Sequence, residues 1–249
     1  MRNIIKTIWK KVSYYLIKFY LLDKDVFIVN DIKDLPKYES GSYSQFAQDA
    51  YIFNEVFNKR NSGTFVDVGG NEPIHCNNTY LFELNNWSGI AIEPQDKLRV
   101  LWSTNRKAEC LDYVIGKEDK DVVFVEGGDE EHGLSGVDEF NKVSDKNKHK
   151  IVKHQKRLDE ILLEKNLISI DFLSIDVEGY EMQVLESVDF EKVDIKVICI
   201  ENNINFTNIP IIGKYIGGEL GNNVIRKFLR KRGYRQVARL MCDDVFIKK

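Results

Sequence analysis

The segment Thr64–Asn71 (TFVDVGGN) decides the fold class of this 249-residue chain. Its apolar residues predict a buried strand over Thr64–Val68, and Gly69 and Gly70 follow at once. Glycine lets a backbone turn sharply and approach a ligand closely, because it carries no Cβ atom. The third glycine of a dinucleotide-binding GxGxxG motif is missing, since residues 72–74 read EPI. The turn by itself is equally typical of an ordinary strand-to-loop junction.

Apolar strand-like runs alternate with helical patterns around this turn. Further strands are predicted at Gly89–Glu93, Cys110–Ile115, Asp171–Asp176 and Ile195–Glu201. Helices are predicted at Gln45–Asn58, Thr79–Asn85, Asp96–Ser103, Leu158–Lys165, Tyr180–Ser187 and near Asn222–Lys231. Regular β–α alternation with apolar strands indicates a parallel sheet that is covered on both faces. The final strands, Tyr234–Met241 and Asp244–Ile247, predict a C-terminal antiparallel hairpin.

The N-terminal residues 1–41 are expected to form an amphipathic helix followed by a linker. Apolar residues between Ile4 and Leu22 recur at helical spacing, and lysines interrupt them too often for a membrane-spanning helix or a signal peptide. The helix packs on the domain or on a partner subunit, or it lies on an anionic membrane surface. Asp31–Gly41 reads as the linker because of its Pro, Gly and charges.

A polar stretch over Gly127–Gln155 has little apolar periodicity. A long irregular insertion in a compact domain is usually a functional lid or a mobile loop, and we expect one of these here.

Composition excludes several classes of protein. Charged residues make up 30% of the chain and nearly balance to a net charge of −3, which disfavours a nucleic-acid binder. The four cysteines lie far apart, so neither a disulfide framework nor a zinc site is expected. A cytoplasmic location is the simplest expectation, with contact to the inner face of the membrane through the N-terminal helix as an addition.

An acidic residue, Glu93, ends the strand that follows the glycine turn. A carboxylate at this place can accept hydrogen bonds from both hydroxyls of a ribose, although it could also be a solvated loop residue. Asp67 and Glu93 both lie at the carboxyl ends of predicted strands, which is where ligands bind in open α/β sheets. Together they favour nucleoside binding.

At this point the chain resembles the FkbM-type methyltransferases, which use S-adenosylmethionine. The resemblance rests on motifs in family order between about residues 43 and 203: SQFAQD (Ser44–Asp49), FVDVGGN (Phe65–Asn71), NNTYLFELNNWSGIAIEP (Asn77–Pro94), Leu134–Gly136, RLDEIL (Arg157–Leu162) and DFLSIDVEGYEMQVLES (Asp171–Ser187). It implies a Rossmann-like methyltransferase fold over residues 42–249, with a mostly parallel seven-stranded sheet. The family usually has Ala where this chain has Gly70, a small change that should not stop cofactor binding.

The resemblance also implies cofactor contacts. Asp67, Gly69, Gly70 and Asn71 should line the methionine end, and Glu93 with Pro94 should hold the ribose. Asp112 or its neighbours could face the adenine. Gln45, Gln48 and Asp49 could close over the cofactor, although Gln48 and Asp49 could equally belong to a plain helix surface.

The catalytic candidates are Asp176, Glu178 and His75. The two carboxylates lie where the predicted strand Asp171–Asp176 meets its helix, at the mouth of the cofactor crevice. They could orient the donor or act on the acceptor, or they could simply compensate the helix dipole. His75 follows the glycine turn, and the other histidines, His132, His149 and His154, are less well placed.

No compact spacing of ligands predicts a metal site, although Asp176, Glu178 and Glu201 could in principle hold a divalent ion. We therefore expect a metal-independent enzyme that O-methylates a sugar, a glycan or a related small molecule. The alternatives are a non-catalytic binding or trafficking module and, less well supported, a nicotinamide-dependent oxidoreductase. A basic stretch, Arg226–Arg235, could favour an anionic acceptor or a phospholipid surface, or it could be a solvated helix face.

Overall fold

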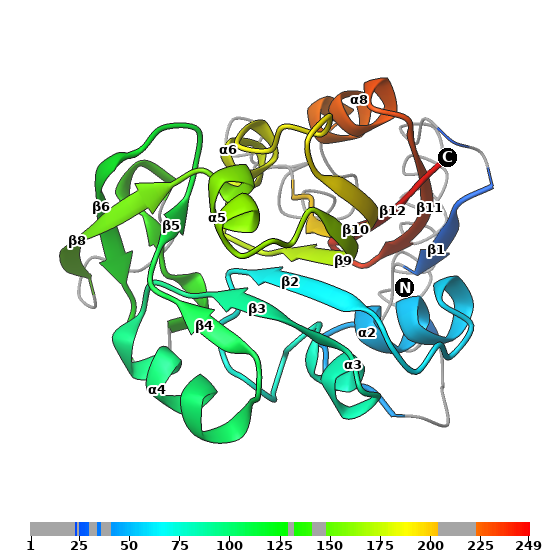
Figure 1. Cartoon of the computed structure of the whole chain (residues 1–249), viewed down its shortest axis with the longest axis horizontal. Helices are drawn as coiled ribbons and strands as arrows, with labels where there is room; N and C mark the ends of the chain where they lie inside the picture. The colour runs from blue at the N-terminus through cyan, green and yellow to red at the C-terminus, as the bar shows by residue number, and fades with distance from the viewer. Residues whose placement is uncertain are drawn as a thin grey trace, which may run out of the picture. The chain divides into compact units, whose positions relative to one another are not determined.

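The computed structural model describes residues 23, 25–29, 34–35, 41–128, 132–140, 148–203 and 223–249 (Figure 1). The predicted N-terminal helix and most of the predicted linker lie outside the described residues. Among the helices that are described, none is long and apolar enough to cross a membrane.

The chain divides into two compact units. The larger unit comprises residues 37–198, and the smaller one comprises residues 1–36 together with 199–249. The first cut lies close to the predicted boundary at residue 41. The second cut falls inside a strand, β10 (Asp194–Glu201), and no pattern in the sequence predicted it.

The larger unit contains the parallel sheet that the sequence predicted. Its strands follow the order β10-β9-β2-β3-β4. The bounds are β2 (Thr64–Val68), β3 (Ser88–Ile92), β4 (Glu109–Leu111) and β9 (Ser169–Ile175). The pairings of β2 with β3, of β2 with β9 and of β3 with β4 are all parallel. Residues 65–68 of β2 are all buried, so the strand is covered on both faces, as β–α alternation implies.

The longer helices of this unit bury one apolar stripe. The helices of the unit are α2 (Gln48–Tyr51), which continues as a π-helical turn η2 (Ile52–Val56), α3 (Tyr80–Leu84), α4 (Asp96–Asn105), α5 (Leu158–Glu164) and α6 (Glu181–Glu186). In α4 the buried residues Leu98 and Trp102 lie one turn apart, and in α5 Leu158, Ile161 and Leu162 form the buried stripe.

The structure contains a second, four-stranded sheet, and two of its strands come from the predicted insertion. The expectation of an irregular stretch was therefore wrong for residues 136–137 and 149–155. The order of this sheet is β5-β8-β6-β7. The strands are β5 (Val114–Ile115), β6 (Lys120–Glu126), β7 (Gly136–Val137) and β8 (His149–Lys156), with short 3-10 turns η3 (His132–Leu134) and η4 (Asp138–Phe140). The predicted strand Cys110–Ile115 is also corrected, because β4 and β5 belong to different sheets. The new sheet buries a small cluster formed by Val114, Phe124 and Val137.

The smaller unit contains the predicted C-terminal hairpin. Its elements are β1 (Phe27–Val29), α8 (Asn223–Lys231), β11 (Tyr234–Leu240) and β12 (Asp243–Lys248). β11 and β12 pair antiparallel, which confirms the hairpin. β1 pairs parallel with β11 and was not predicted, so the expectation of seven strands left it out. Three residues are too few to show an alternating pattern.

One buried carboxylate, Asp244, holds this smaller unit together. It is fully buried and accepts hydrogen bonds from Arg226, Arg239, Gln236 and Asn202. Burial alone would raise the pKa of Asp244, but the two guanidinium groups outweigh it and the pKa is lowered. Arg226 therefore belongs to the core of this unit and not to a solvated basic face.

Candidate functional site

The larger unit encloses a cavity of about 650 Å³. It opens at the carboxyl ends of β2, β3 and β9, the edge at which ligands bind in open α/β sheets. One wall comes from the second sheet, through Tyr113–Ile115, Phe124 and Gly133–Val137. The stretch that looked like a lid in the sequence thus includes a folded wall of the cavity.

Two glycines allow the backbone to close around this cavity. Gly69 has a φ of +80°, and a Cβ there would lie 1.8 Å from the carbonyl oxygen of Asp176. The N–H groups of Gly69 and Gly70 both donate to the carbonyl of Ile92, at 3.0 and 3.2 Å. A Cβ on Gly70 would lie 2.9 Å from the indole of Trp102, so the buried tryptophan fills the space of the alanine that the family usually has. The turn after β2 therefore has no room for a side chain at residue 69, because the turn after β9 lies against it.

Glu93 is buried at the end of β3 and bridges two loops. One carboxylate oxygen accepts the N–H of Asn71 and the other accepts the N–H of Gln95, both at 2.9 Å. Burial raises the pKa of Glu93, and the two backbone hydrogen bonds oppose that rise only in part. The side chain of Gln95 donates a third hydrogen bond to the carboxylate, which leaves one of its four lone pairs for a ligand hydroxyl.

Asp67 has a different environment, because neighbouring side chains hold its carboxylate. Asn77 and Thr79 donate to Oδ2 at 3.1 and 2.7 Å. Burial raises the pKa of Asp67, and these hydrogen bonds and the charge of Arg106 oppose the rise. Asp67 contributes to the cavity lining, and its hydrogen bonds hold the loop that follows the glycine turn.

Arg106, at the end of α4, supports the same loop, and sequence reasoning missed it. Its fully buried guanidinium donates to the carbonyl of Pro73 at 2.7 Å, to Asn77 at 3.1 Å and to Thr79 at 3.2 Å. It also pairs with Glu83 at 3.2 Å and lies 4.2 Å from the centroid of Trp102. An isolated arginine after a helix gives no signal in a sequence, because its partners come from a segment some thirty residues earlier.

Asn71 offers an acceptor to a ligand. Its Oδ1 atom is buried and has no hydrogen-bond partner among the described residues. Its backbone is in the left-handed region, with φ at 43°, and its carbonyl accepts the indole N–H of Trp102 at 2.8 Å. An orphaned buried oxygen in a cavity wall costs free energy unless a ligand or a water supplies a donor.

The N-terminal side of the cavity is built by Gln45 and Gln48, which both line it. Gln48 is 3% exposed, and its side chain accepts the N–H of Phe46 at 2.8 Å. Asp49 is fully buried and accepts hydrogen bonds from Tyr43 and Ser44. The alternative of a plain helix surface is therefore wrong for both Gln48 and Asp49.

Asp112 is not among the residues that line the cavity. It is exposed and pairs with Arg99 at 2.8 Å and with Lys153 at 2.9 Å. Its neighbours Tyr113–Ile115 line the cavity instead. Pro94 lines the cavity next to Glu93, in the position expected for it.

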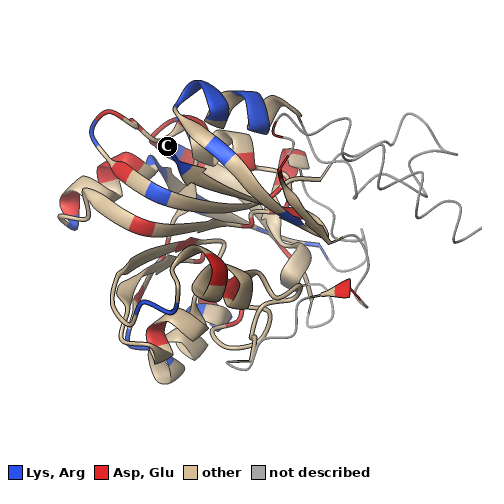
Figure 2. Cartoon of the chain, turned by 90° about the vertical axis from the view of Figure 1, so that its right-hand side faces the viewer, with Lys and Arg blue, Asp and Glu red and all other residues tan. Residues whose placement is uncertain are grey.

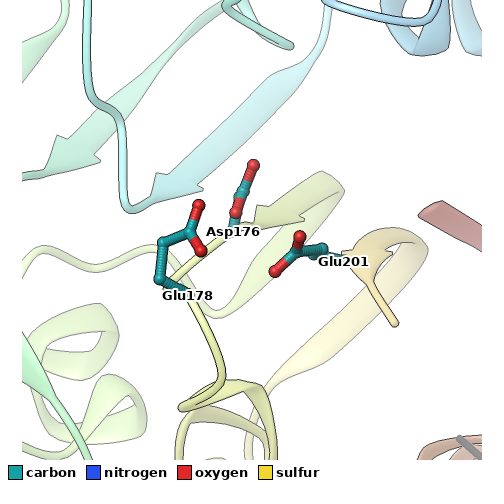
Figure 3. A group of neighbouring side chains, drawn as sticks. All are labelled: Asp176, Glu178 and Glu201. Carbon is teal, nitrogen blue, oxygen red and sulfur yellow. The ribbon is translucent and has the colours of Figure 1, made fainter. Parts of the chain in front are cut away.

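Asp176 and Glu178 lie on the turn after β9, and Glu201 lies at the end of β10 (Figure 3). Asp176 is exposed at the cavity, and the backbone of Glu178 is in the left-handed region at φ 57°. Neither residue is the N-cap of α6, which is Tyr180, and the N–H of Gly179 donates to Glu181 at 2.8 Å. A strained non-glycine residue in a cavity wall is typical of a functional turn. Glu201 belongs to the smaller unit, and we assign no metal site to the three carboxylates.

Acidic side chains dominate the charge of the cavity lining. The lining residues that carry a formal negative charge when ionised are Asp67, Glu72, Glu93, Asp176 and Glu178. Within the part of the chain that the structure describes, no Lys or Arg lines the cavity. The cavity therefore suits a cationic or neutral ligand better than an anionic one.

A family model described as the methyltransferase FkbM domain matches residues 67–236, more than half of the chain. The chain belongs to the FkbM methyltransferase family. Its fold also resembles the crystal structure of methyltransferase FkbM from Methylobacillus flagellatus KT, with 10% identity and a TM-score of 0.46. That alignment covers 99% of this chain but only 60% of the other, so the chain spans about three fifths of that protein's length. A comparison with curated proteins gives no match.

The histidines of this FkbM-family chain are distributed unevenly around the site. His75 is exposed and lines the cavity. His149 pairs with Glu126, and His154 pairs with Asp119 and Asp121, away from the lining. The side chain of His132 lies outside the described residues.

Two further contacts fix the cavity wall of this FkbM-family chain and were not predicted. Tyr180 donates to Gln155 at 3.0 Å, which ties the turn carrying Glu178 to β8. Ser135 donates to Gln95 at 3.1 Å and so ties the residues before β7 to the loop after Glu93. Leu134–Gly136 was the family motif that lies in this wall.

Proposed function

We propose that the chain is an S-adenosylmethionine-dependent methyltransferase. The observation that carries the proposal is the cavity at the carboxyl edge of the sheet, lined by carboxylates and by no lysine or arginine among the described residues. S-adenosylmethionine carries a sulfonium and an ammonium group, which such a lining favours. A nicotinamide dinucleotide carries a pyrophosphate, which requires positive groups or a glycine-rich helix N-terminus.

The residues present fit this cofactor. Glu93 would accept a ribose hydroxyl with its remaining lone pair, and Tyr113–Ile115 would line the adenine. The orphaned Oδ1 atom of Asn71 would accept a hydrogen bond from the ammonium group at the methionine end. The bound cofactor would supply an activated methyl group, and the protein would supply alignment with the acceptor.

We further propose that the acceptor is a hydroxyl of a sugar, a glycan or a related small molecule. Transfer to a hydroxyl needs a group that removes a proton. Asp176 is the best candidate, because it is exposed at the cavity on the turn that touches Gly69. Glu178 and His75 line the same space and are the alternatives.

Thermal melting of the purified chain tests the cofactor class. We expect S-adenosylhomocysteine to raise the melting temperature in a concentration-dependent way, and NAD⁺ to leave it unchanged. Stabilisation by NAD⁺ alone would overturn the proposal in favour of an oxidoreductase. Stabilisation by neither ligand would favour a non-catalytic binding module.

Methyl transfer is tested separately with radiolabelled S-adenosylmethionine and a panel of neutral sugars and glycans. Label in a base-stable product would support O-methylation. A chain that binds S-adenosylhomocysteine but transfers no methyl group to any member of the panel would contradict the acceptor class and leave the cofactor proposal intact.

A further inference from the structure

The end of β9 carries the part of the cavity wall that the cofactor contacts proposed above leave open. In the strand order β9-β2-β3-β4, Tyr113–Ile115 follow β4, Glu93 follows β3 and the two glycines follow β2. A cofactor bound to these three groups extends from the end of β4 to the end of β2. The next strand is β9, and Ser174 near its end and Asp176 directly after it both line the cavity. In the proposed function we therefore expect the acceptor at the end of β9.

Asn78 lines this part of the cavity, and a hydrogen-bond network fixes its amide group. Its Nδ2 atom donates to Oγ of Ser174 at 3.1 Å. The hydroxyl of Ser174 in turn bonds to the buried carboxylate of Asp67. Because a serine has a single hydroxyl hydrogen, which it gives to the carboxylate, Oγ can only accept a hydrogen bond from Asn78. The nitrogen of the amide therefore faces Ser174, and the oxygen does not.

The network leaves the amide oxygen of Asn78, Oδ1, available to a ligand. This atom has no hydrogen-bond partner among the described residues. Gln45 also lines the cavity, and its side-chain amide likewise has no hydrogen-bond partner in the part of the chain that the structure describes. The segments that carry the two amides lie side by side, because the N–H of Asn77 donates to the carbonyl of Tyr43 at 3.2 Å. An amide offers both donors and an acceptor, which suits a hydroxyl group.

The charges around Asn78 disfavour an anionic acceptor. Asp67 lies beside Ser174 on the paired strand β2, and Asp176 follows Ser174 by two residues. The lysines and arginines of the described residues lie outside the cavity lining, and Figure 2 shows several of them in blue along α8 of the smaller unit. A phosphate or carboxylate bound at Asn78 would face repulsion without a counter-charge. A neutral acceptor with hydroxyl groups suits this wall better.

We propose that Asn78 determines acceptor specificity, because its Oδ1 atom accepts a hydrogen bond from an acceptor hydroxyl other than the one that is methylated. The inference rests on the proposed methyltransferase function and narrows the acceptor to a neutral molecule with at least two hydroxyls. The hydrogen bond to Asn78 would align the reacting hydroxyl with Asp176, which follows Ser174 by two residues. An acceptor with a single hydroxyl would lack this contact and would be a poorer substrate.

The variant Asn78→Leu tests the proposal, because leucine is similar to asparagine in size and lacks the amide. The probes are methyl glycosides of neutral hexoses and, for the glycoside that is methylated best, the deoxy analogues that each lack one hydroxyl other than the methylated one. In the wild type, one of these analogues should have a kcat/KM about tenfold lower than its parent, the effect of one lost hydrogen bond. Asn78→Leu should lower kcat/KM for the parent by about the same factor and should no longer distinguish the parent from that analogue. If Asn78→Leu distinguished every analogue as strongly as the wild type does, the proposal would be overturned.

The matched control is Asn85→Leu. Asn85 is partly buried, like Asn78, and its Nδ2 atom donates one hydrogen bond, to the carbonyl of Leu81 at 2.8 Å, but it does not line the cavity. Each variant loses one hydrogen bond within the protein, so we expect similar melting temperatures for the two. Only Asn78→Leu should lower kcat/KM. Equal losses of kcat/KM in both variants would overturn the proposal, since a loss of stability would then explain them.

Binding of S-adenosylhomocysteine, measured by calorimetry, separates this inference from the proposed function. The affinity of Asn78→Leu should equal that of the wild type. A loss of this affinity that matches the loss of kcat/KM would place Asn78 at the cofactor and overturn the inference, while the cofactor proposal would stand. No binding to the wild type would overturn the proposed function itself.

Saturation-transfer NMR of the glycosides with the chain bound to S-adenosylhomocysteine tests the inference without turnover. We expect a glycoside that binds the wild-type complex and the Asn85→Leu complex but not the Asn78→Leu complex. Equal binding to all three complexes, or a panel in which no glycoside binds the wild-type complex, would overturn the inference.

Discussion

In the proposed function Glu93 has two tasks, because the carboxylate that joins two loops would also accept a ribose hydroxyl. Burial raises its pKa, so it takes up a proton at a higher pH than an ordinary glutamate, whose pKa is about 4.3. A protonated carboxyl loses part of its acceptor capacity. We expect the affinity for S-adenosylhomocysteine, measured by calorimetry at a series of pH values, to fall as the pH is lowered through this raised pKa.

The variant Glu93→Gln is the control for this pH dependence. It should bind the ligand about 2–3 kcal/mol less tightly than the wild type, with no such pH dependence, because the titrating group is gone. An unchanged affinity would remove Glu93 from the ribose role, and an unchanged pH profile would assign the titration to another group.

Variants of Asp176 and His75 test which of these two residues accepts the proton in the proposed reaction. Asp176→Asn keeps the shape of the side chain and removes its basicity, so we expect cofactor affinity to stay near normal and turnover to fall about 10²–10⁴-fold. His75→Gln should have a smaller effect, since this side chain lies on the exposed rim of the cavity. Single-turnover assays with an identified acceptor measure the rate of methyl transfer in both variants. Near-normal turnover in Asp176→Asn, with none in His75→Gln, would transfer the role to the histidine.

At the level of elements, the loop after β2 is held against the end of α4 by one planar group. The guanidinium of Arg106 donates hydrogen bonds to Pro73, Asn77 and Thr79. The ammonium group of a lysine has only one nitrogen and cannot make all three hydrogen bonds in this geometry. We expect Arg106→Lys to lower the affinity for S-adenosylhomocysteine about tenfold and to lower the melting temperature, because a loosened loop displaces Asn71 from the ligand.

Arg157→Lys is the matched control for this prediction, since the guanidinium of Arg157 also makes several hydrogen bonds, but its partners, Asp159 and the carbonyl of Lys117, do not line the cavity. Calorimetry measures the affinity of both variants for S-adenosylhomocysteine. Equal affinities would show that Arg106 supports the stability of the fold and not the geometry of the site.

For the whole molecule, acid sensitivity should be concentrated at Asp244. Its folded-state pKa is lowered, so its stabilisation is fully present above the unfolded value of about 3.9 and is lost as the pH falls through the folded value. We expect Asp244→Asn to reduce the free energy of unfolding at pH 7 by about 3–5 kcal/mol, because Arg226 and Arg239 lose their buried counter-charge.

Urea unfolding of the wild type and of Asp244→Asn at a series of pH values measures this effect. The difference between the two should narrow below about pH 4, as the wild-type carboxyl itself takes up a proton. A difference that stays constant down to the lowest pH would mean that the stabilisation comes from packing and not from charge.

Local signals in the sequence were enough to predict the elements that build the site. The end of the apolar run Thr64–Val68, its two glycines, and Glu93 after the next strand all line the cavity. The hairpin of β11 and β12 was also predicted, because alternation and a short connection are properties of neighbouring residues. Family motifs placed Asp176 and Glu178 at the same cavity.

Only the tertiary structure decided which distant groups meet. The second sheet pairs β6 with a β8 whose lysines and histidines hide its alternation. Asp112 faces Arg99 and Lys153 across separate elements, and Arg226 turns inward to Asp244 while its neighbours stay exposed. Periodicity in the sequence indicates which face of an element is apolar. The counter-charge or hydrogen-bond partner of a charged side chain on that element comes from another segment of the chain. The free energy of burying a charged side chain depends on that partner. Whether a charged residue is buried or exposed is therefore decided by the tertiary structure and not by the local sequence.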